Sequence, residues 1–457
     1  MIINMVNRKH WIAMACSLLC FTNVQAAALT FDSGSDGSDG ALDFTWAASL
    51  PAAERTIVFD PKDDATFDPG SGRELDPNND NVFHFTRILI PTNVTVVLRA
   101  DKLLWRPVYW LATDDITIQY SGYLYLGGAN GHSETSQGNA RVPAMPGPGG
   151  FPGGLGASGV AKATAGFGPG AGLPATTDGE GGDASHSTLG SGNSGGTAGA
   201  LYGTPYLVPF VGGSGGAGGG NSTQTQPNSR SGGGAGGGAI VLSSSTKILN
   251  DGQITADGGY GDGGSGSFTA GGGFGSGGSV RLMAPTIMGR IYHYNSGSGS
   301  ITVRGGRSNT AKSNGRIRIE AFNNQLQNSF FPDNTDAVRI SGLVPTTPFL
   351  PSDSRVPGWP SVQVVSIDGI SLPTIPTASF SVPDAQINSA TDVAVVFATS
   401  NIPTTASLTL QIISPDNDVI IVSPSHSSGT QANSTWNTTV TFPAGFSRGY
   451  VQATWTP

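Results

Sequence analysis

Residues 239–259 read AIVLSSSTKILNDGQITADGG, and this phrase differs in composition from the glycine-rich sequence on either side of it. It contains an apolar triple, a polar corner, a second apolar patch, an Asx-Gly turn at residues 251–252 and a closing Gly-Gly pair. Short apolar runs separated by turn residues are typical of β-strands. The phrase therefore predicts three short strands joined by a corner and a turn.

The same phrase occurs elsewhere in the chain. Residues 108–128 read VYWLATDDITIQYSGYLYLGG, residues 279–306 repeat the order with a longer insertion, and residues 316–321 (RIRIEA) begin a further copy. Strand-rich repeats of about 20 residues are a signature of solenoids, in which each coil packs only against its neighbours. We therefore expect stacked β-coils in the middle of the chain.

Glycine separates these copies, and part of it is periodic. A left-handed polyproline II helix has three residues per turn, so glycine at every third position lets neighbouring strands approach closely. Packed polyproline II strands and flexible Gly/Ser loops are the two alternatives for these segments. The period-three glycines are Gly147, Gly150, Gly153, Gly156 and Gly159, then Gly212, Gly215 and Gly218, then Gly272, Gly275 and Gly278.

These patterns predict an all-β fold: a parallel β-solenoid with long glycine-rich insertions, in one alternative polyproline II, and a C-terminal immunoglobulin-like β-sandwich. The expected divisions are a signal peptide at 1–26, an acidic segment rich in Gly and Asp at 27–81, the solenoid at 82–324 with its main insertion at 127–238, a Pro-rich linker at 325–360, and the sandwich at 361–457.

The expected sandwich contains about seven short runs of alternating apolar and polar residues, which is the pattern of strands that are buried on one face. The chain has no cysteine in this part, so apolar side chains alone must form its core. The predicted core residues are Val395, Phe397, Leu408, Leu410, Ile420, Trp436, Val440 and Val451.

The first 26 residues have the three zones of a secretory leader: Arg8 and Lys9, an apolar stretch, and a small-residue cleavage site. Both cysteines of the chain, Cys16 and Cys20, lie within it. An exported bacterial protein is the natural interpretation. A net charge of −8, with only 12% charged residues, disfavours binding to nucleic acid or to anionic lipid.

Metal binding has one candidate set. Asp32, Asp36 and Asp39 are spaced among Gly and Ser, and residues 76–81 (DPNNDN) form a second acidic cluster. Calcium prefers several oxygen ligands on a flexible loop. The alternatives are a calcium site and a solvated, turn-rich segment; no other cofactor is expected.

No catalytic residue is predicted. Parallel β-solenoids do host polysaccharide lyases and hydrolases, and the charged residues on the expected coils are Asp114, Asp115, Arg281, Arg304, Arg316, Arg318 and Glu320. The last three of these alternate with isoleucines, as on a strand with one face inward. We expect that their own face is solvated.

Aromatic residues and histidines offer further candidates. Trp105, Tyr109 and Trp110 could close one end of the coils or stack on sugar rings. His132 and His186 lie in glycine-rich segments, beside Glu134 and Asp183 respectively. The bulky residues of the main insertion are expected to anchor it to the coils: Phe151, Phe167, Tyr202, Tyr206 and Phe210.

Several phrases resemble a group of bacterial secreted glycine-rich surface proteins: residues 232–259, GSGGSVRLMAPTI, NGRIRIEAF and FDSGSDGSDGALDF. The resemblance implies an extracellular β-solenoid scaffold with variable glycine-rich loops, and it implies no reaction. The coils are more distantly similar to those of filamentous adhesins. The triplet glycines are similar to the polyproline II sandwiches of certain phage tail-tip adhesins.

We therefore expect a secreted, non-enzymatic protein of the extracellular space or outer cell surface, with a structural or adhesive role. Its expected partners are surface glycans, matrix polymers or further copies of itself, with no nucleic acid and no transmembrane segment in the mature chain. A carbohydrate-active β-helix enzyme is the first alternative, with Asp114 and Asp115 as its candidates. A calcium- or ice-binding extracellular module is the second.

Overall fold

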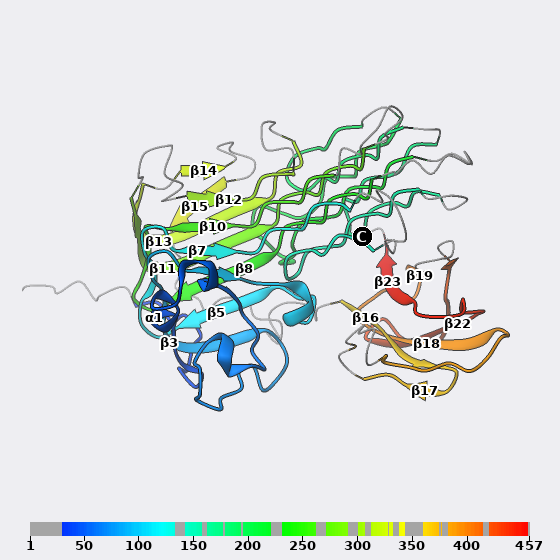
Figure 1. Cartoon of the computed structure of the whole chain (residues 1–457), viewed down its shortest axis with the longest axis horizontal. Helices are drawn as coiled ribbons and strands as arrows, with labels where there is room; N and C mark the ends of the chain where they lie inside the picture. Colours follow the sequence, from blue (N-terminus) through cyan, green and yellow to red (C-terminus); the bar gives the residue numbers. More distant parts are fainter. Residues whose placement is uncertain are drawn as a thin grey trace, which may run out of the picture.

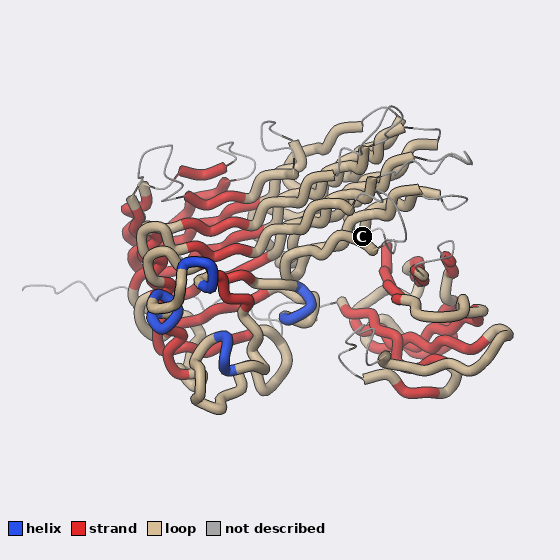
Figure 2. Tube along the Cα trace, in the orientation of Figure 1, coloured by secondary structure: helices blue, strands red, loops and turns tan. Residues whose placement is uncertain are grey.

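The structure is a computed structural model of the chain. It describes residues 30–132, 142–157, 162–176, 179–192, 195–220, 231–261, 271–290, 300–306, 312–327, 329–331, 338–342, 360–373, 376, 383–414 and 420–455. Almost all of its regular structure is β (Figures 1 and 2). The predicted signal peptide and most of the predicted Pro-rich linker lie outside the described residues.

The largest sheet has nine strands, and every strand pair in it is parallel. Its order is β15-β13-β11-β8-β5-β3-β6-β9, with β1 beside β3 and β9 also beside β11. The strands are β1 (Gly40–Asp43), β3 (Val82–Ile90), β5 (Val108–Ala112), β6 (Ile116–Ile118), β8 (Ala239–Ser244), β9 (Lys247–Asn250), β11 (Ser279–Gly289), β13 (Arg316–Leu326) and β15 (Val338–Gly342).

A second parallel sheet has six strands in the order β14-β12-β10-β7-β4-β2. Figure 1 shows β7, β10, β12 and β14 lying one above another. The strands are β2 (Thr56–Val58), β4 (Thr95–Val97), β7 (Tyr123–Tyr125), β10 (Gln253–Thr255), β12 (Ser300–Thr302) and β14 (Ser329–Phe331). Each repeated phrase thus contributes its first two runs to the nine-stranded sheet and its third to this one.

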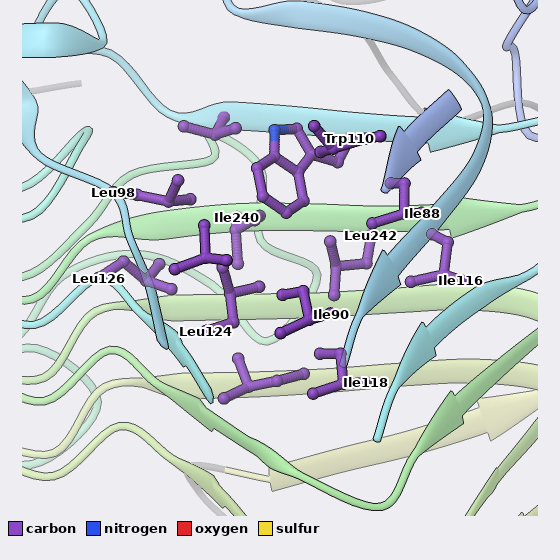
Figure 3. Packing of buried hydrophobic residues seen from close by; sticks show 14 of the residues in the cluster. Ile88, Ile90, Leu98, Trp110, Ile116, Ile118, Leu124, Leu126, Ile240 and Leu242 are labelled. Carbon is purple, nitrogen blue, oxygen red and sulfur yellow. The ribbon is translucent and has the colours of Figure 1, made fainter. Parts of the chain in front are cut away.

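One apolar core joins the two sheets. Because side chains alternate along a strand, Ile240 and Leu242 of β8 point inward together and meet Leu124 of β7, as Figure 3 shows. Trp110 is fully buried in the same cluster. The core is therefore built by the apolar positions that the repeated phrase marks.

The N-terminal region covers one end of this core with short helical turns and aromatic side chains. It contains α1 (Thr45–Ala48), η1 (Ala52–Glu54) and η2 (Asp64–Thr66); η3 (Ala100–Lys102) follows β4. The ring of Phe59 lies edge-on to Phe83 and Trp110, with centroids 5.6 and 5.5 Å away. Residues 30–75 therefore close the apolar core at this end.

The described glycine-rich residues between β7 and β8, between β10 and β11, and between β12 and β13 form what we call the glycine layer. Figure 2 shows them as loop segments that run side by side and continue the direction of the strands. Their backbones bond to one another: Gly154 N–H donates to Gly216 O, Gly216 N–H to Gly234 O, and Gly234 N–H to Gly273 O, at 2.8 to 2.9 Å. These described segments are packed and hydrogen-bonded rather than free loops.

The approach of these backbones leaves no room for side chains. A Cβ at Gly236 would lie 1.8 Å from the carbonyl oxygen of Gly213, and one at Gly218 would lie 1.8 Å from that of Leu155. The period-three glycines share this crowding, with a backbone atom within 2.6 Å of the would-be Cβ at Gly147, Gly150, Gly153, Gly212, Gly215, Gly218, Gly272, Gly275 and Gly278. Glycine is therefore needed here because neighbouring backbones occupy the side-chain volume.

The prediction of a β-solenoid is wrong, although the expectation of an almost all-β chain is confirmed. Strand β9 pairs with both β6 and β11, so β11, β8, β5, β3, β6 and β9 close into a six-stranded parallel barrel. Here the chain leaves the sheets after the third run of each phrase and enters the glycine layer before the next phrase begins. The apolar period revealed the strands, but it could not reveal that glycine backbones pack as a layer of their own.

The C-terminal part forms two antiparallel sheets with one shared core. Six of the eight predicted core residues are buried, while Ile420 and Val451 pack against the core half-buried. The five-stranded sheet has β17 (Ile370–Ser371), β16 (Ser361–Ile367), β18 (Val393–Ser400), β22 (Asn433–Val440) and β21 (Ser425–Gly429) in that order. The three-stranded sheet has β20 (Ile420–Val422), β19 (Ser407–Ile413) and β23 (Arg448–Thr454).

Aromatic side chains join the C-terminal sheets to the glycine layer. The ring of Tyr450 on β23 lies 5.1 Å from Phe167 and 6.5 Å from Trp105, centroid to centroid. Phe167 and Tyr450 share a small apolar cluster with Leu155, Ile413 and Phe151. Phe167 thus packs against the C-terminal sheets, whereas Phe210 packs on Tyr109 of the nine-stranded sheet, as the anchoring prediction requires.

Candidate functional site

The outer face of the six-stranded sheet carries hydroxyl-bearing and aromatic side chains in register. The inward residues of β2, β4, β7, β10 and β12 are buried, so their neighbours point outward. One row across the strands is Thr56, Thr95, Tyr123, Gln253 and Ser300, and the next is Val58, Val97, Tyr125, Thr255 and Thr302. We call this surface the tyrosine face.

A glycine positions the ring of Tyr125. A Cβ at Gly127, two residues along the chain, would lie 2.7 Å from both Cζ and Oη of Tyr125, so the hydroxyl end of the phenol ring lies against this glycine. The ring of Tyr123 stands across it, with centroids 5.7 Å apart and planes at 72°. Tyr125 is half-buried, so part of its side chain is open to solvent.

Next to this ring lies an ion pair. The carboxylate of Asp257 accepts hydrogen bonds from the backbone N–H of Arg304 at 2.6 Å and from its Nε at 3.3 Å. The side chains are 23% and 36% exposed, respectively, so both groups are reachable from solvent. Burial raises the pKa of Asp257, while Arg304 acts in the opposite direction.

Two threonine hydroxyls support this surface from below, since Thr255 and Thr302 are 6% and 5% exposed. Thr302 Oγ1 donates to Thr255 Oγ1 at 2.9 Å, and the Thr255 side chain hydrogen-bonds with Tyr123. Burial raises the pKa of both Tyr123 and Tyr125, which keeps the phenols protonated at neutral pH. The face thus presents two half-buried tyrosines and one compensated ion pair, above buried threonine hydroxyls.

Such a surface can bind a polyhydroxylated ligand. The C–H groups on one side of a sugar ring pack on an aromatic π face, and carboxylate and guanidinium groups bind its hydroxyls. Arg304 was among the candidates from the sequence, but Tyr123, Tyr125 and Asp257 were missed. The signal that could have found them is the aligned position of YLY and QIT in successive copies of the phrase.

The charged residues of β11 and β13 do not form the solvated face that we expected. Arg318 is 9% exposed and Glu320 only 2%. Both Arg318 and Arg281 bond to Oε1 of Glu320, the latter through Nε at 3.0 Å. Residues 202–206 cover them, since Arg318 donates to Pro205 O and lies under the exposed ring of Tyr206.

Arg316 lies beside this cluster and donates to Tyr202 O at 3.1 Å. Pairs of buried charges that are mutually hydrogen-bonded are costly to break. Arg316 and Arg318 therefore hold the segment 202–206 on the sheet, while Glu320 binds Arg281 and Arg318. The alternating pattern alone did not indicate this structural role.

Asp114 and Asp115, the candidates of the enzymatic alternative, lie at the corner between β5 and β6. Lys247 Nζ lies 2.7 Å from Oδ2 of Asp115, and Thr246 Oγ1 donates to its Oδ1 at 2.6 Å. Ser244 Oγ donates to the backbone carbonyl of Asp114. Both aspartates thus tie one corner to the corner of the next phrase.

The calcium candidates are engaged in local turns. Asp32 and Asp36 each accept a hydrogen bond from the backbone N–H two residues further on. Asp39 accepts one from the N–H of His84 at 2.6 Å. Hydrogen bonds from Ser38 lower the pKa of Asp36. Across the described part of the chain, no three His, Cys, Asp or Glu side chains gather where they could hold a metal ion.

Two of the three aromatic candidates near residue 108 are core residues. Tyr109 and Trp110 are 1% and 0% exposed, so neither can stack on a ligand. Trp105 contacts Tyr450 of the C-terminal sheets instead. The sugar-stacking alternative therefore has no support from these two buried rings.

His186 is enclosed in the glycine layer. Its ring stacks on Tyr202, with centroids 4.3 Å apart, and its Nδ1 lies 2.9 Å from Gly277 O. Burial lowers its pKa to about 4, so it is neutral at pH 7. Asp183 is also buried and accepts backbone hydrogen bonds. His132 is exposed, whereas Glu134 lies outside the described residues.

Comparisons with protein family models, curated proteins and solved structures found no match to this chain. None of the helices that the structure describes is both long and apolar enough to span a membrane.

Proposed function

We propose that this chain is an exported bacterial protein with a structural or adhesive role outside the cell, and that it binds glycans without converting them. The observation that carries the proposal is the tyrosine face, where Tyr125, Asp257 and Arg304 combine a stacking ring with hydroxyl-binding groups. The leader-like sequence at 1–26 and the absence of cysteine after it support export.

The glycine layer supports a load-bearing or display role. Its backbone hydrogen bonds link segments that are distant in the sequence, such as Gly154 with Gly233 and Gly216 with Gly234. A layer without side-chain rotamers to rearrange makes a rigid support for a binding surface. The ion-paired corner at Asp115 and Lys247 is better suited to joining two phrases than to acid–base catalysis.

The test is binding of the purified full chain to immobilised polysaccharides and to whole bacterial cells, together with its molecular mass in solution. We expect saturable binding to at least one glycan and no release of shorter products. Absence of binding to cells, matrix and glycans, in a chain that also stays monomeric, would contradict the proposal.

A further inference from the structure

We infer that the tyrosine face binds a linear, uncharged polysaccharide, whose sugar rings stack on Tyr125 and whose hydroxyls bond to Asp257 and Arg304. This inference rests on the proposed function, and it names both the class of ligand and the place where it binds. Three observations carry it: the position of one ring, the register of three strands and the balance of charge.

Gly127 sets the position of the ring. Because Cζ and Oη of Tyr125 lie where a side chain of residue 127 would begin, the hydroxyl end of the ring rests against this glycine, and the half-buried side chain stays partly open to solvent. The ring of Tyr123 stands across it at a centroid distance of 5.7 Å. A flat aromatic surface of this kind fits a pyranose ring, whose axial C–H groups carry partial positive charge.

The register places the polar groups beside that ring. The backbone N–H of residue 128 donates to Asp257 O, and that of residue 258 donates to Arg304 O, so residues 127, 257 and 304 lie side by side on adjacent chain segments. Adjacent parallel strands lie about 4.8 Å apart. A sugar on Tyr125 therefore has Asp257 at its side, and the next sugar along reaches Arg304.

The charge of this region is balanced. Asp257 pairs with Arg304, and the outward charges at the neighbouring strands are also paired, Lys102 with Asp60 at 2.7 Å and Arg99 with Asp101 at 2.8 Å. The whole chain carries a formal charge of −8, so it repels an acidic polymer at long range. An uncharged polysaccharide is the ligand that fits both facts.

The experiment compares binding of full-length protein to cellohexaose and xylohexaose as uncharged probes and to hexagalacturonate as an acidic probe, by calorimetry. Tyr125→Ala should weaken binding of an uncharged probe about ten-fold, because stacking is lost. Gly127→Ala should weaken it similarly while keeping the tyrosine, since its Cβ displaces the ring. Tyr125→Phe should remain within about three-fold of the original protein.

Tyr206→Ala is the matched control, because this exposed tyrosine lies over Arg318 beside the other sheet. Its affinity should equal that of the unaltered protein, and this result, with weaker binding in Tyr125→Ala and Gly127→Ala, supports the inference. Unchanged affinity in both of those variants would overturn it and leave the proposed function standing. Tighter binding of hexagalacturonate would overturn the ligand class. Failure of all three probes, when whole cells are still bound, would overturn this inference alone.

Discussion

The apolar core between the two parallel sheets and the glycine layer beside it reach close packing by opposite means. In the core, side chains such as Leu242 and Trp110 fill the space between backbones. In the layer, backbones fill that space themselves, since the carbonyl oxygen of Gly213 lies 1.8 Å from where a Cβ of Gly236 would stand. One region depends on side chains that are present and the other on side chains that are absent.

This difference determines how each region responds to substitution. Removing atoms harms the core because it leaves a cavity, and adding atoms harms the layer because backbone cannot move aside. Both regions satisfy their backbone polar groups, the core through parallel ladders and the layer through bonds between glycine segments. The contrast predicts that the core is destabilised by substitutions that remove side-chain volume, and the glycine layer by substitutions that add it.

The largest effect is expected from adding one methyl group to the layer. Gly236→Ala places a Cβ against the backbone of residues 213 and 214, which should lower the free energy of unfolding by more than about 4 kcal/mol. Urea unfolding of the full chain measures it. Gly232→Ala is the control, because its nearest atoms are 3.3 Å away, and it should cost much less. Equal costs would contradict backbone-limited packing.

Removing side-chain atoms from the core should have the next largest effect. Leu242→Ala empties a fully buried position on β8 and should cost about 3 kcal/mol in the free energy of unfolding. The same denaturant titration gives the value. A cost below that of Asp115→Ala at the exposed corner would show that the core is not packed as described.

Acid should weaken the glycine layer through His186. Its pKa is lowered to about 4 by burial, against 6.5 for the free side chain, so the unfolded chain takes up the proton first as pH falls. The contribution of neutral His186 to the free energy of unfolding is therefore complete above pH 6.5 and is lost as pH falls toward 4. The loss is about 2 kcal/mol at pH 5.

The comparison of the unaltered protein with His186→Phe isolates this effect, because Phe keeps a ring against Tyr202. Unfolding free energies at pH 7.5 and pH 5 should fall further in the unaltered protein than in the variant. Asp76 acts the other way: burial raises its pKa to about 6, which favours the folded state as pH falls. Identical pH dependence in both proteins would contradict the enclosure of His186.

The smallest effect is expected at the exposed corner. The ion pair of Asp115 with Lys247 has side chains 33% and 44% exposed, and pairs of this kind contribute little. Asp115→Ala should change the free energy of unfolding by less than about 0.5 kcal/mol. The same substitution should leave glycan binding unchanged. If the unaltered protein releases products from a polysaccharide and Asp115→Ala does not, the enzymatic alternative is favoured instead.

The sequence predicted individual strands well because apolar alternation records which side chains face a core. The patch at residues 248–249 and the run around Ile254 are strands of two different sheets, as the corner and turn between them indicate. The C-terminal core was found in the same way, with Phe397 and Trp436 both buried. These successes all depend on side chains.

The glycine layer and the tyrosine face could not be predicted from the sequence, for a related reason. Glycine has no side chain whose pattern could report its neighbours, so the period of three did not decide between packed strands and free loops. Tyr125 and Asp257 lie 132 residues apart in the numbering, and only strand register brings them together. The covering of Arg318 and Glu320 by residues 202–206 likewise depends on how the glycine segments fold back.

Amide hydrogen exchange of the full chain, read by mass spectrometry, tests the packed glycine layer most directly. Peptides that cover residues 212–219, 231–238 and 271–278 should exchange as slowly as those from β8 and β11, because their N–H groups are bonded to neighbouring backbones. Exchange of these peptides at the rate of an unstructured chain, while β8 and β11 stay protected, would contradict the layer and leave the two parallel sheets as the only ordered part of this region.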